Sequence, residues 1–158
     1  MNAIQSGLMI TSFLIILNST ETFGQTVQPI SQKTDAIVKN TDSASSMNFL
    51  MHHLNSFLSN DLEAVISDYT NESVLITPTA TYTGKKKISE FFAELIKYFP
   101  KQKSDFGLDR TVIKNDIIYI IWHAKTPVVN VDFGSDTFII KDGKIHYQTY
   151  AAQLQFFK

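Results

Sequence analysis

An Asp-Gly pair near the C-terminus separates two apolar runs and limits how this chain can fold. Asp142-Gly143 is a two-residue connection between β-rich segments, which is the strongest short-range signal for a β-hairpin. Two earlier β-rich runs are divided in the same way by Asn115-Asp116. The loop between these two hairpins holds Pro127 and Gly134. The pattern predicts four antiparallel strands, at 108–114, 117–125, 136–141 and 145–154.

Three amphipathic segments precede these strands. Apolar residues recur at helical spacing in 47–58, 62–69 and 88–99. A small hairpin, with strands at 74–77 and 79–83, lies between the second and third helices. Helices grouped ahead of an antiparallel sheet predict an α+β fold in which the helices cover one sheet face.

The N-terminus carries the pattern of a secretory signal peptide. The run from Gly7 to Leu17 is almost entirely apolar, and polar, turn-forming residues follow it. This order is typical of a signal peptide, and the run is too short to span a bilayer comfortably. We expect residues 1–24 to be removed, 25–46 to form a polar linker and 47–158 to form the domain. The mature protein is then exported, to the periplasm or outside the cell, and is not bound to a membrane.

Composition excludes several partners and cofactors. The chain has 14 basic and 15 acidic residues, and its one arginine is Arg110, so it lacks the positive field that nucleic acids require. The absence of cysteine excludes disulfides, thiolate metal ligands and a cysteine nucleophile. His52 and His53 are adjacent on a helix and diverge by about 100°, so they cannot bind one metal ion together. Dinucleotide and phosphate-loop motifs are absent as well. We expect no metal and no cofactor.

Three stretches of the sequence carry a family resemblance: HHLNSFLSNDLEAVISDYTNESVLITP, YTGKKKISEFF and DTFIIKDGKIHYQTY. Their order and spacing between Met47 and Phe157 resemble the nuclear transport factor 2-like superfamily, particularly its SnoaL-like and ketosteroid-isomerase-like branch. The resemblance implies a cystatin-like cone, in which a curved antiparallel sheet wraps around three N-terminal helices and leaves a pocket in its mouth. Function varies widely on this fold and has to be argued from the site.

The resemblance also implies positions for site residues. It implies a hydroxyl donor on the first helix, where this chain has His53, and a carboxylic acid on a later strand, where Asp136 stands. A general-base carboxylate is implied just before the proline that ends the first strand, but Thr77 precedes Pro78 here. A threonine alcohol is far too weak a base to take a proton from carbon. We therefore do not expect the double-bond migration of the isomerases.

Strand periodicity gives an independent prediction of the pocket. If Asp136 points inward, Phe138 does too, because alternate side chains share a face. A similar register turns His123 inward on the preceding strand and Gln148 inward on the last. A shift of one residue would exchange His123 for Trp122. The predicted ligand-binding residues are His53, Phe57, Tyr119, Ile121, His123, Asp136, Phe138, Gln148 and Tyr150.

Two functions remain open from the sequence. In the first, the domain holds a small, mostly apolar molecule and performs no chemistry. In the second, it is a cofactor-independent isomerase, cyclase or dehydratase in which Asp136 and His53 divide the acid and base roles. The missing base at Thr77 favours ligand binding without chemistry. The enzyme function requires that Asp136 and His53 line one cavity. A purely structural alternative is an ion pair between Asp136 and Lys125.

The outer face of the sheet predicts self-association. Under the register above, the outward residues include Ile120, Trp122, Ile139, Tyr147 and Thr149. Such a face is too apolar to stay in contact with water. We therefore expect a homodimer.

Overall fold

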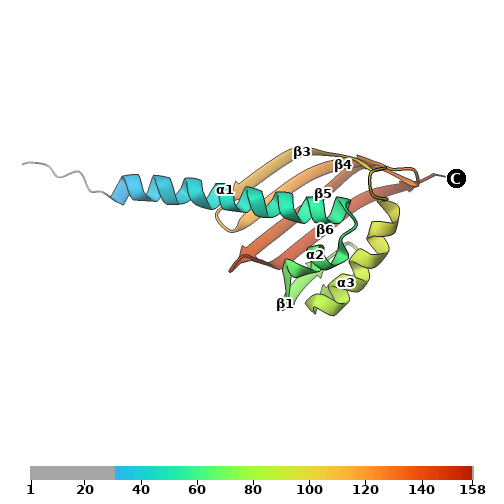
Figure 1. Ribbon diagram of the computed structural model, residues 1–158, viewed down its shortest axis with the longest axis horizontal. Helices are drawn as coiled ribbons and strands as arrows, with labels where there is room; N and C mark the ends of the chain where they lie inside the picture. The colour runs from blue at the N-terminus through green and yellow to red at the C-terminus, as the bar shows by residue number, and fades with distance from the viewer. Residues whose placement is uncertain (1–30, 158) are drawn as a thin grey trace, which may run out of the picture. The chain divides into compact units, whose positions relative to one another are not determined.

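The computed structural model describes the backbone of residues 31–157 and the side chains of residues 43–157 (Figure 1). The predicted signal peptide at 1–24 lies outside these residues. Two helices and a small hairpin are followed by a third helix and a meander of long strands. The elements are α1 (Ser31–Leu58), α2 (Leu62–Ser67), β1 (Tyr69–Ile76), β2 (Thr81–Thr83), α3 (Gly84–Leu95), the 3₁₀ turn η1 (Ile96–Tyr98), β3 (Asp105–Lys114), β4 (Ile117–Lys125), β5 (Val129–Lys141) and β6 (Lys144–Phe156).

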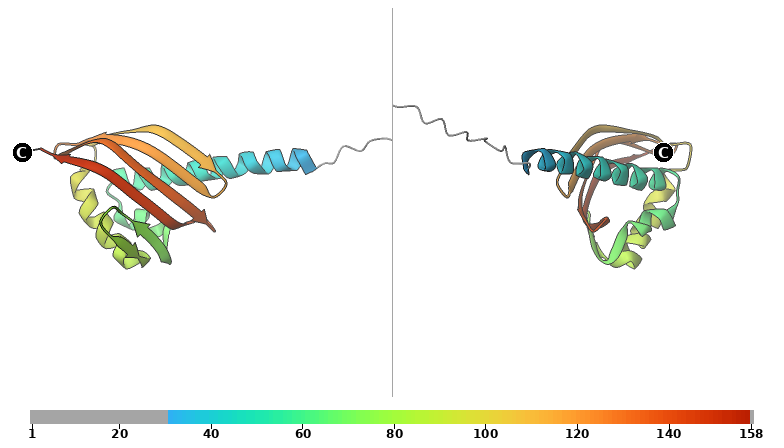
Figure 2. Two further views of the ribbon diagram at one scale, coloured as in Figure 1. Left: turned by 180° about the vertical axis from the view of Figure 1, so that it is seen from behind. Right: turned by 60° about the vertical axis from the view of Figure 1, so that its left-hand side comes forward.

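The strands form one curved sheet with the helices on its concave side (Figure 2). Their order is β2-β1-β6-β5-β4-β3, so the hairpin of β1 and β2 joins the meander at β6. The predicted α+β fold and its helix-filled cone are confirmed. The sheet is mixed rather than wholly antiparallel, because β1 runs parallel to β6. The remaining neighbours pair antiparallel.

Helix α1 begins earlier than predicted. It starts at Ser31 rather than near Met47, so much of the segment expected as a linker is helical. No glycine or proline occurs between Ser31 and Leu58, and nothing in the backbone forces a break. The helix ends as predicted before Asn60, which has a positive φ of 55°. Asp61 then caps α2, accepting a hydrogen bond from the Ala64 amide at 3.0 Å.

Two other boundaries differ from the prediction for physical reasons. Tyr69, expected at the end of the second helix, begins β1 because its completely buried side chain and its pairing with Ile145 bring it into the sheet. Gly134, expected in a loop, lies within β5 opposite Trp122, at an irregularity in the pairing. A Cβ at this position would overlap the Trp122 indole, so the glycine lets the ring lie against the strand.

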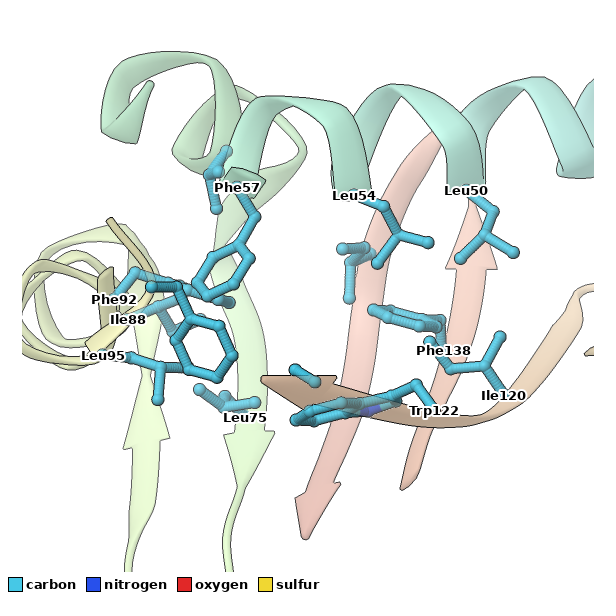
Figure 3. Close-up of a cluster of buried hydrophobic side chains, with 14 of the residues drawn as sticks. Leu50, Leu54, Phe57, Leu75, Ile88, Phe92, Leu95, Ile120, Trp122 and Phe138 are labelled. Atoms are coloured by element: carbon cyan, nitrogen blue, oxygen red, sulfur yellow. The ribbon is translucent and has the colours of Figure 1, made fainter. Parts of the chain in front are cut away.

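The hydrophobic core fills the space between the helices and the concave face (Figure 3). Helix α1 contributes one apolar face, α3 contributes another, and the sheet supplies the opposite wall. Each fully buried large side chain stabilises the fold by roughly 1.5–3 kcal/mol relative to exposure. The labelled members are Leu50, Leu54, Phe57, Leu75, Ile88, Phe92, Leu95, Ile120, Trp122 and Phe138. No helix within the described residues is long and apolar enough to cross a membrane.

Candidate functional site

A cavity of about 40 Å³ lies inside the cone, between α1, α3 and the concave face. Its walls are mainly aromatic and aliphatic. A few polar side chains interrupt them, and these come from α1, β5 and β6. The polar members are His53, Asp136, Gln148 and Tyr150. Apolar walls with sparse polar groups are typical of a small-molecule site.

His53 on α1 is held in place by a buried carboxylate. Its Nδ1 donates to Asp68 Oδ2 at 2.8 Å, and both side chains are buried. The ring meets Tyr69, Phe92 and Phe138 edge-on, with centroid distances of 5.8, 5.9 and 5.4 Å. A histidine whose Nδ1 is bound to a carboxylate has a set orientation and tautomer. Its Nε2 is then the nitrogen free to exchange a proton.

Asp136 on β5 is the centre of a second buried hydrogen-bond network. Trp122 Nε1 donates to its Oδ2 at 2.7 Å, and Gln148 Nε2 donates to its Oδ1 at 2.8 Å. The Tyr69 hydroxyl in turn donates to Gln148 Oε1. Lys125 is not part of this network, so the ion pair considered above is not formed.

Burial raises the pKa of Asp136 from 3.8 to about 6, although the hydrogen bonds from Gln148 and Trp122 and the charge of His53 act in the opposite direction. At neutral pH most molecules therefore carry a carboxylate here, which accepts hydrogen bonds. In mildly acidic solution a substantial fraction carries the neutral acid. A group that changes charge this close to neutrality is able to give and take protons.

Tyr150 on β6 lies beside Asp136, its cross-strand partner. Its ring packs between Phe91 and Trp122, at centroid distances of 5.5 and 6.2 Å. Its hydroxyl oxygen is buried and has no hydrogen-bond partner among the described residues. Burial and, less strongly, the charge of Asp136 raise the pKa of this phenol, so it stays protonated and can donate. An unsatisfied buried hydroxyl costs roughly 1–3 kcal/mol.

The cavity brings together six of the nine residues predicted from the sequence. These are His53, Phe57, Asp136, Phe138, Gln148 and Tyr150. Asp136 and His53 line the same cavity, which is the geometry that an enzyme requires. The expected inward orientation of β5 is correct.

The other three predicted residues are on the wrong face. Tyr119, Ile121 and His123 point away from the cavity, while Ile118, Ile120, Trp122 and Ala124 are buried. Strand β4 is apolar on both faces, so its composition does not distinguish one face from the other. The one-residue shift considered above is the register that the protein adopts. His123 instead pairs with Asp109 on the outer face, Nδ1 to Oδ1 at 2.8 Å.

Sequence analysis missed Asp68 and Tyr69, because both were assigned to a helix segment. Their roles depend on contacts across 15 and 79 residues of sequence, to His53 and Gln148 respectively. Gly134 did offer a signal. A glycine amid β-branched and aromatic residues indicates a close approach by a bulky partner, and the single tryptophan is on the neighbouring strand.

His52 and His53 do not form a metal site. Both Nδ1 atoms approach Asp68, at 3.3 and 2.8 Å. Within residues 43–157 no group of three or more His, Asp or Glu side chains is arranged to hold a metal ion.

Solved structures resemble this chain closely in fold and weakly in sequence. An NTF-2 like protein of unknown function from Burkholderia xenovorans LB400 superposes with a TM-score of 0.60 at 12% identity, covering 74% of this chain and 89% of the other. A SnoaL-like protein of unknown function from Burkholderia thailandensis E264 gives 0.59 at 15% identity, covering 70% and 96%. The domain has the nuclear transport factor 2-like fold.

This nuclear transport factor 2-like fold does not by itself carry an activity. A de novo designed protein with a curved β-sheet superposes equally well, with a TM-score of 0.61 at 9% identity over 70% of this chain and 86% of the other. No family model matches the sequence, and no curated protein is similar to it. The function therefore has to be argued from the cavity.

Proposed function

We propose that this domain binds a small, mostly apolar molecule with one hydroxyl or carbonyl oxygen. The observation that carries the proposal is the buried, unpartnered hydroxyl of Tyr150 on a mainly apolar cavity. A ligand oxygen there would accept from Tyr150. A ligand hydroxyl would also donate to the neighbouring carboxylate of Asp136. Two complementary groups at one point are sufficient to orient a small apolar ligand.

The chemistry of the cavity supports the same proposal. Its volume of about 40 Å³ exceeds the roughly 10–15 Å³ that a single water molecule needs but is below the roughly 150 Å³ of a cavity that holds benzene, so a ring-sized ligand enters only when the wall moves. Most of its wall is made of aromatic rings and leucines, which favour apolar groups by removing them from water.

Trp122 makes binding directly measurable. It is the single tryptophan of the chain, and it lines the cavity. We expect cyclohexanol to change its fluorescence in a saturable manner. Tyr150→Phe should bind cyclohexanol about tenfold more weakly, because the ligand oxygen loses its donor. The matched control is Tyr119→Phe, which removes a hydroxyl from the outer face and should bind as the wild type does.

Asp136 gives a second test with the same alcohol. Asp136→Asn keeps a hydrogen-bonding group and should largely retain binding. Asp136→Leu leaves the ligand hydroxyl without a partner and should bind about ten- to a hundredfold more weakly. Equal affinity of the Asn and Leu variants would show that Asp136 has only a structural role.

A second candidate function is acid–base catalysis on the same ligand class, and the Asp68–His53 pair favours it. A histidine oriented by a buried carboxylate, on one cavity with an acid of pKa about 6, is able to move a proton on and off a substrate. Thr77 takes no part, since its hydroxyl bonds to Ala80 in a turn.

Deuterium exchange tests this second candidate. In heavy water the wild type should accelerate exchange of the protons beside the carbonyl of cyclohexanone, and His53→Ala should not. Equal exchange rates with wild type, His53→Ala and no protein would leave ligand binding as the proposed function.

We also propose that two copies associate through the outer sheet face. The residues expected there have to be corrected, because Ile120 and Trp122 are buried inside the cone. The face nevertheless carries apolar side chains between polar ones such as Lys114 and Thr137. The apolar members include Val112, Ile117, Tyr119, Ile121, Ile139 and Tyr147. Light scattering at micromolar concentration should give the mass of a dimer, and Tyr147→Glu should give that of a monomer.

Export remains a proposal that rests on the N-terminal sequence. We propose cleavage near Gly24–Gln25 and release of the mature protein to the periplasm or outside the cell. The intact mass of protein recovered from that compartment should correspond to a chain that starts close to Gln25. Recovery of the uncleaved chain from the cytoplasm would contradict this.

A further inference from the structure

A second hollow, open to solvent, lies at the rim of the cone beside the cavity. This groove has a volume of about 350 Å³ and runs between α3 and η1 on one side and β6 on the other. Its floor is apolar and its rim carries two carboxylates. The floor includes Tyr82, Phe91, Tyr98 and Leu154, and the rim includes Glu90 and Glu94.

The groove and the cavity share two wall residues, Leu95 and Tyr150. Tyr150 therefore has the cavity on one side and the groove on the other. Its ring makes aromatic contacts with Phe91 and Trp122, and its hydroxyl bonds to no described residue. Rotating this side chain breaks no hydrogen bond. A movement that exposes the Tyr150 hydroxyl to water or to a ligand would instead allow the hydroxyl to form a hydrogen bond.

We propose that the groove is the outer half of the ligand site and that Tyr150, which forms the wall between the two halves, is a gate that swings aside so that one ligand occupies both. The ligand is then an elongated, neutral amphiphile. Its oxygen-bearing head lies in the cavity against Tyr150 and Asp136, and its apolar tail lies in the groove. The inference rests on the proposed binding function and adds the ligand's shape, charge and route of entry.

The volumes support an elongated ligand. The cavity of about 40 Å³ has room for only a few non-hydrogen atoms around the ligand oxygen, whereas the groove of about 350 Å³ has room for a chain of several carbons. The floor of the groove is half-buried and apolar, with Phe91 and Leu154 packed against the core on their inner sides. Covering it with a hydrocarbon tail removes apolar surface of both partners from water.

The charges favour a neutral ligand. Asp136 places a carboxylate at the head-group position at neutral pH, and burial makes its repulsion of another anion strong. At the rim, Glu90 and Glu94 are already paired with Lys87 and Lys97, at 2.7 and 2.6 Å. No lysine, arginine or histidine lines the groove, so alcohols are favoured over fatty acids there.

Three cyclohexane derivatives test these features by Trp122 fluorescence. They are cyclohexanol, 4-butylcyclohexanol and 4-butylcyclohexanecarboxylate. We expect the butyl group to tighten binding about tenfold or more, since each buried methylene contributes to affinity. We expect the carboxylate to bind at least tenfold more weakly than 4-butylcyclohexanol. Equal or tighter binding of the carboxylate would overturn the neutral-ligand assignment.

A pair of neighbouring substitutions on β6 tests the groove itself. Leu154→Glu puts a charge on its floor, and Gln153→Glu puts the same charge on an exposed position of the same strand. Leu154→Glu should abolish the advantage of the butyl group without weakening cyclohexanol, and Gln153→Glu should preserve both affinities. An undiminished butyl advantage in Leu154→Glu would overturn the groove assignment. If neither alcohol binds to wild type, the proposed function fails and this inference fails with it.

Stopped-flow mixing tests the gate. Tyr150→Ala removes the wall, so the association rate constant for 4-butylcyclohexanol should rise about tenfold. Tyr150→Phe keeps the ring and should associate within about twofold of the wild-type rate, while dissociating faster. This variant keeps the test decisive if the alanine variant folds poorly. A wild-type association rate in Tyr150→Ala, or a tenfold faster one in Tyr150→Phe, would overturn the gate.

Discussion

Two histidine–aspartate pairs in this protein have hydrogen bonds of the same length but different surroundings. His53 and Asp68 meet inside the cone, and His123 and Asp109 meet on the outer sheet face, each with 2.8 Å between Nδ1 and a carboxylate oxygen. The side chains of the inner pair are 4% and 6% exposed, whereas those of the outer pair are 50% and 47% exposed.

The comparison teaches that burial, and not geometry, determines what such a pair contributes. In water the outer pair competes with solvent and salt, and pairs of this kind contribute about 0–1 kcal/mol. Inside the cone neither group can turn to water, so loss of one partner leaves the other unsatisfied at a cost of several kcal/mol. The inner histidine is also fixed beside a cavity, where its orientation has a chemical use.

The largest expected difference is in the free energy of unfolding when one carboxylate is removed from each pair. Asp68→Ala should lower the free energy of unfolding by about 3 kcal/mol, because buried His53 loses its acceptor. Asp109→Ala should lower it by less than about 1 kcal/mol. Urea unfolding of both variants at neutral pH measures the difference. Equal destabilisation would mean that the inner pair is as accessible to water as the outer one.

The third carboxylate in the comparison, Asp136, is buried and has only neutral hydrogen-bond donors. Because its pKa is raised from 3.8 to about 6, the folded state holds this proton more tightly than the unfolded chain does. Its contribution to stability is therefore greatest below about pH 4 and falls by about 3 kcal/mol as pH rises through about 6.

Asp136→Asn cannot titrate and should lack this decline. Urea unfolding of wild type and variant between about pH 4 and pH 7 isolates the effect, because all other groups are common to both proteins. The stability difference should shift in favour of the variant as pH rises. Parallel curves would show that Asp136 is accessible to water.

Two glycines extend the comparison to packing. A Cβ at Gly134 would overlap the buried Trp122 indole, and a Cβ at Gly107 would overlap the exposed His123 imidazole. His123 can swing into solvent, whereas Trp122 is enclosed and donates to Asp136. Gly134→Ala should therefore cost about 2 kcal/mol of stability and shift the tryptophan emission. Gly107→Ala should cost less than about 1 kcal/mol of stability. Equal losses of stability in the two variants would contradict the claim that Trp122 is enclosed and His123 is free to move.

The smallest expected effect concerns the second histidine near Asp68. His52 approaches that carboxylate at 3.3 Å, but its side chain is 54% exposed. His52→Ala should change the free energy of unfolding by less than about 0.5 kcal/mol, as expected for a surface pair. His53→Ala, measured beside it, should cost several times more. A larger loss in His52→Ala would assign part of the inner pair's stability to this neighbour.

The order of the elements and the fold could be predicted from local patterns. Helical spacing around Leu50 and Phe92 and the Asp142-Gly143 hairpin each depend on a few neighbouring residues. The parallel pairing of β1 with β6 could not be predicted in the same way, because it joins segments about half the chain apart. The start of α1 was missed because polar residues with modest helix propensity continue a helix when no glycine or proline stops it.

The cavity could be predicted where one polar residue marked the inner face. On β5 Asp136 is flanked by Ser135 and Thr137, and alternation from an inward Asp136 correctly placed Phe138 on the inner face. Strand β4 offers no such marker, since Ile120 and Ile121 are equally apolar. Asp68 was beyond sequence reasoning, because its partner His53 is reached only when α2 packs against α1.

The parallel pairing of β1 and β6 has a consequence for how the cavity forms. Tyr69 pairs with Ile145 and bonds to Gln148, so the chain has to close a loop of more than seventy residues before these groups meet. Closing so long a loop costs entropy that few local contacts offset. We therefore expect the hydrogen-bond network around Asp136 to appear in the last and slowest folding phase. Until β6 has been synthesised, the chain lacks Gln148 and Tyr150, so this wall of the cavity cannot form.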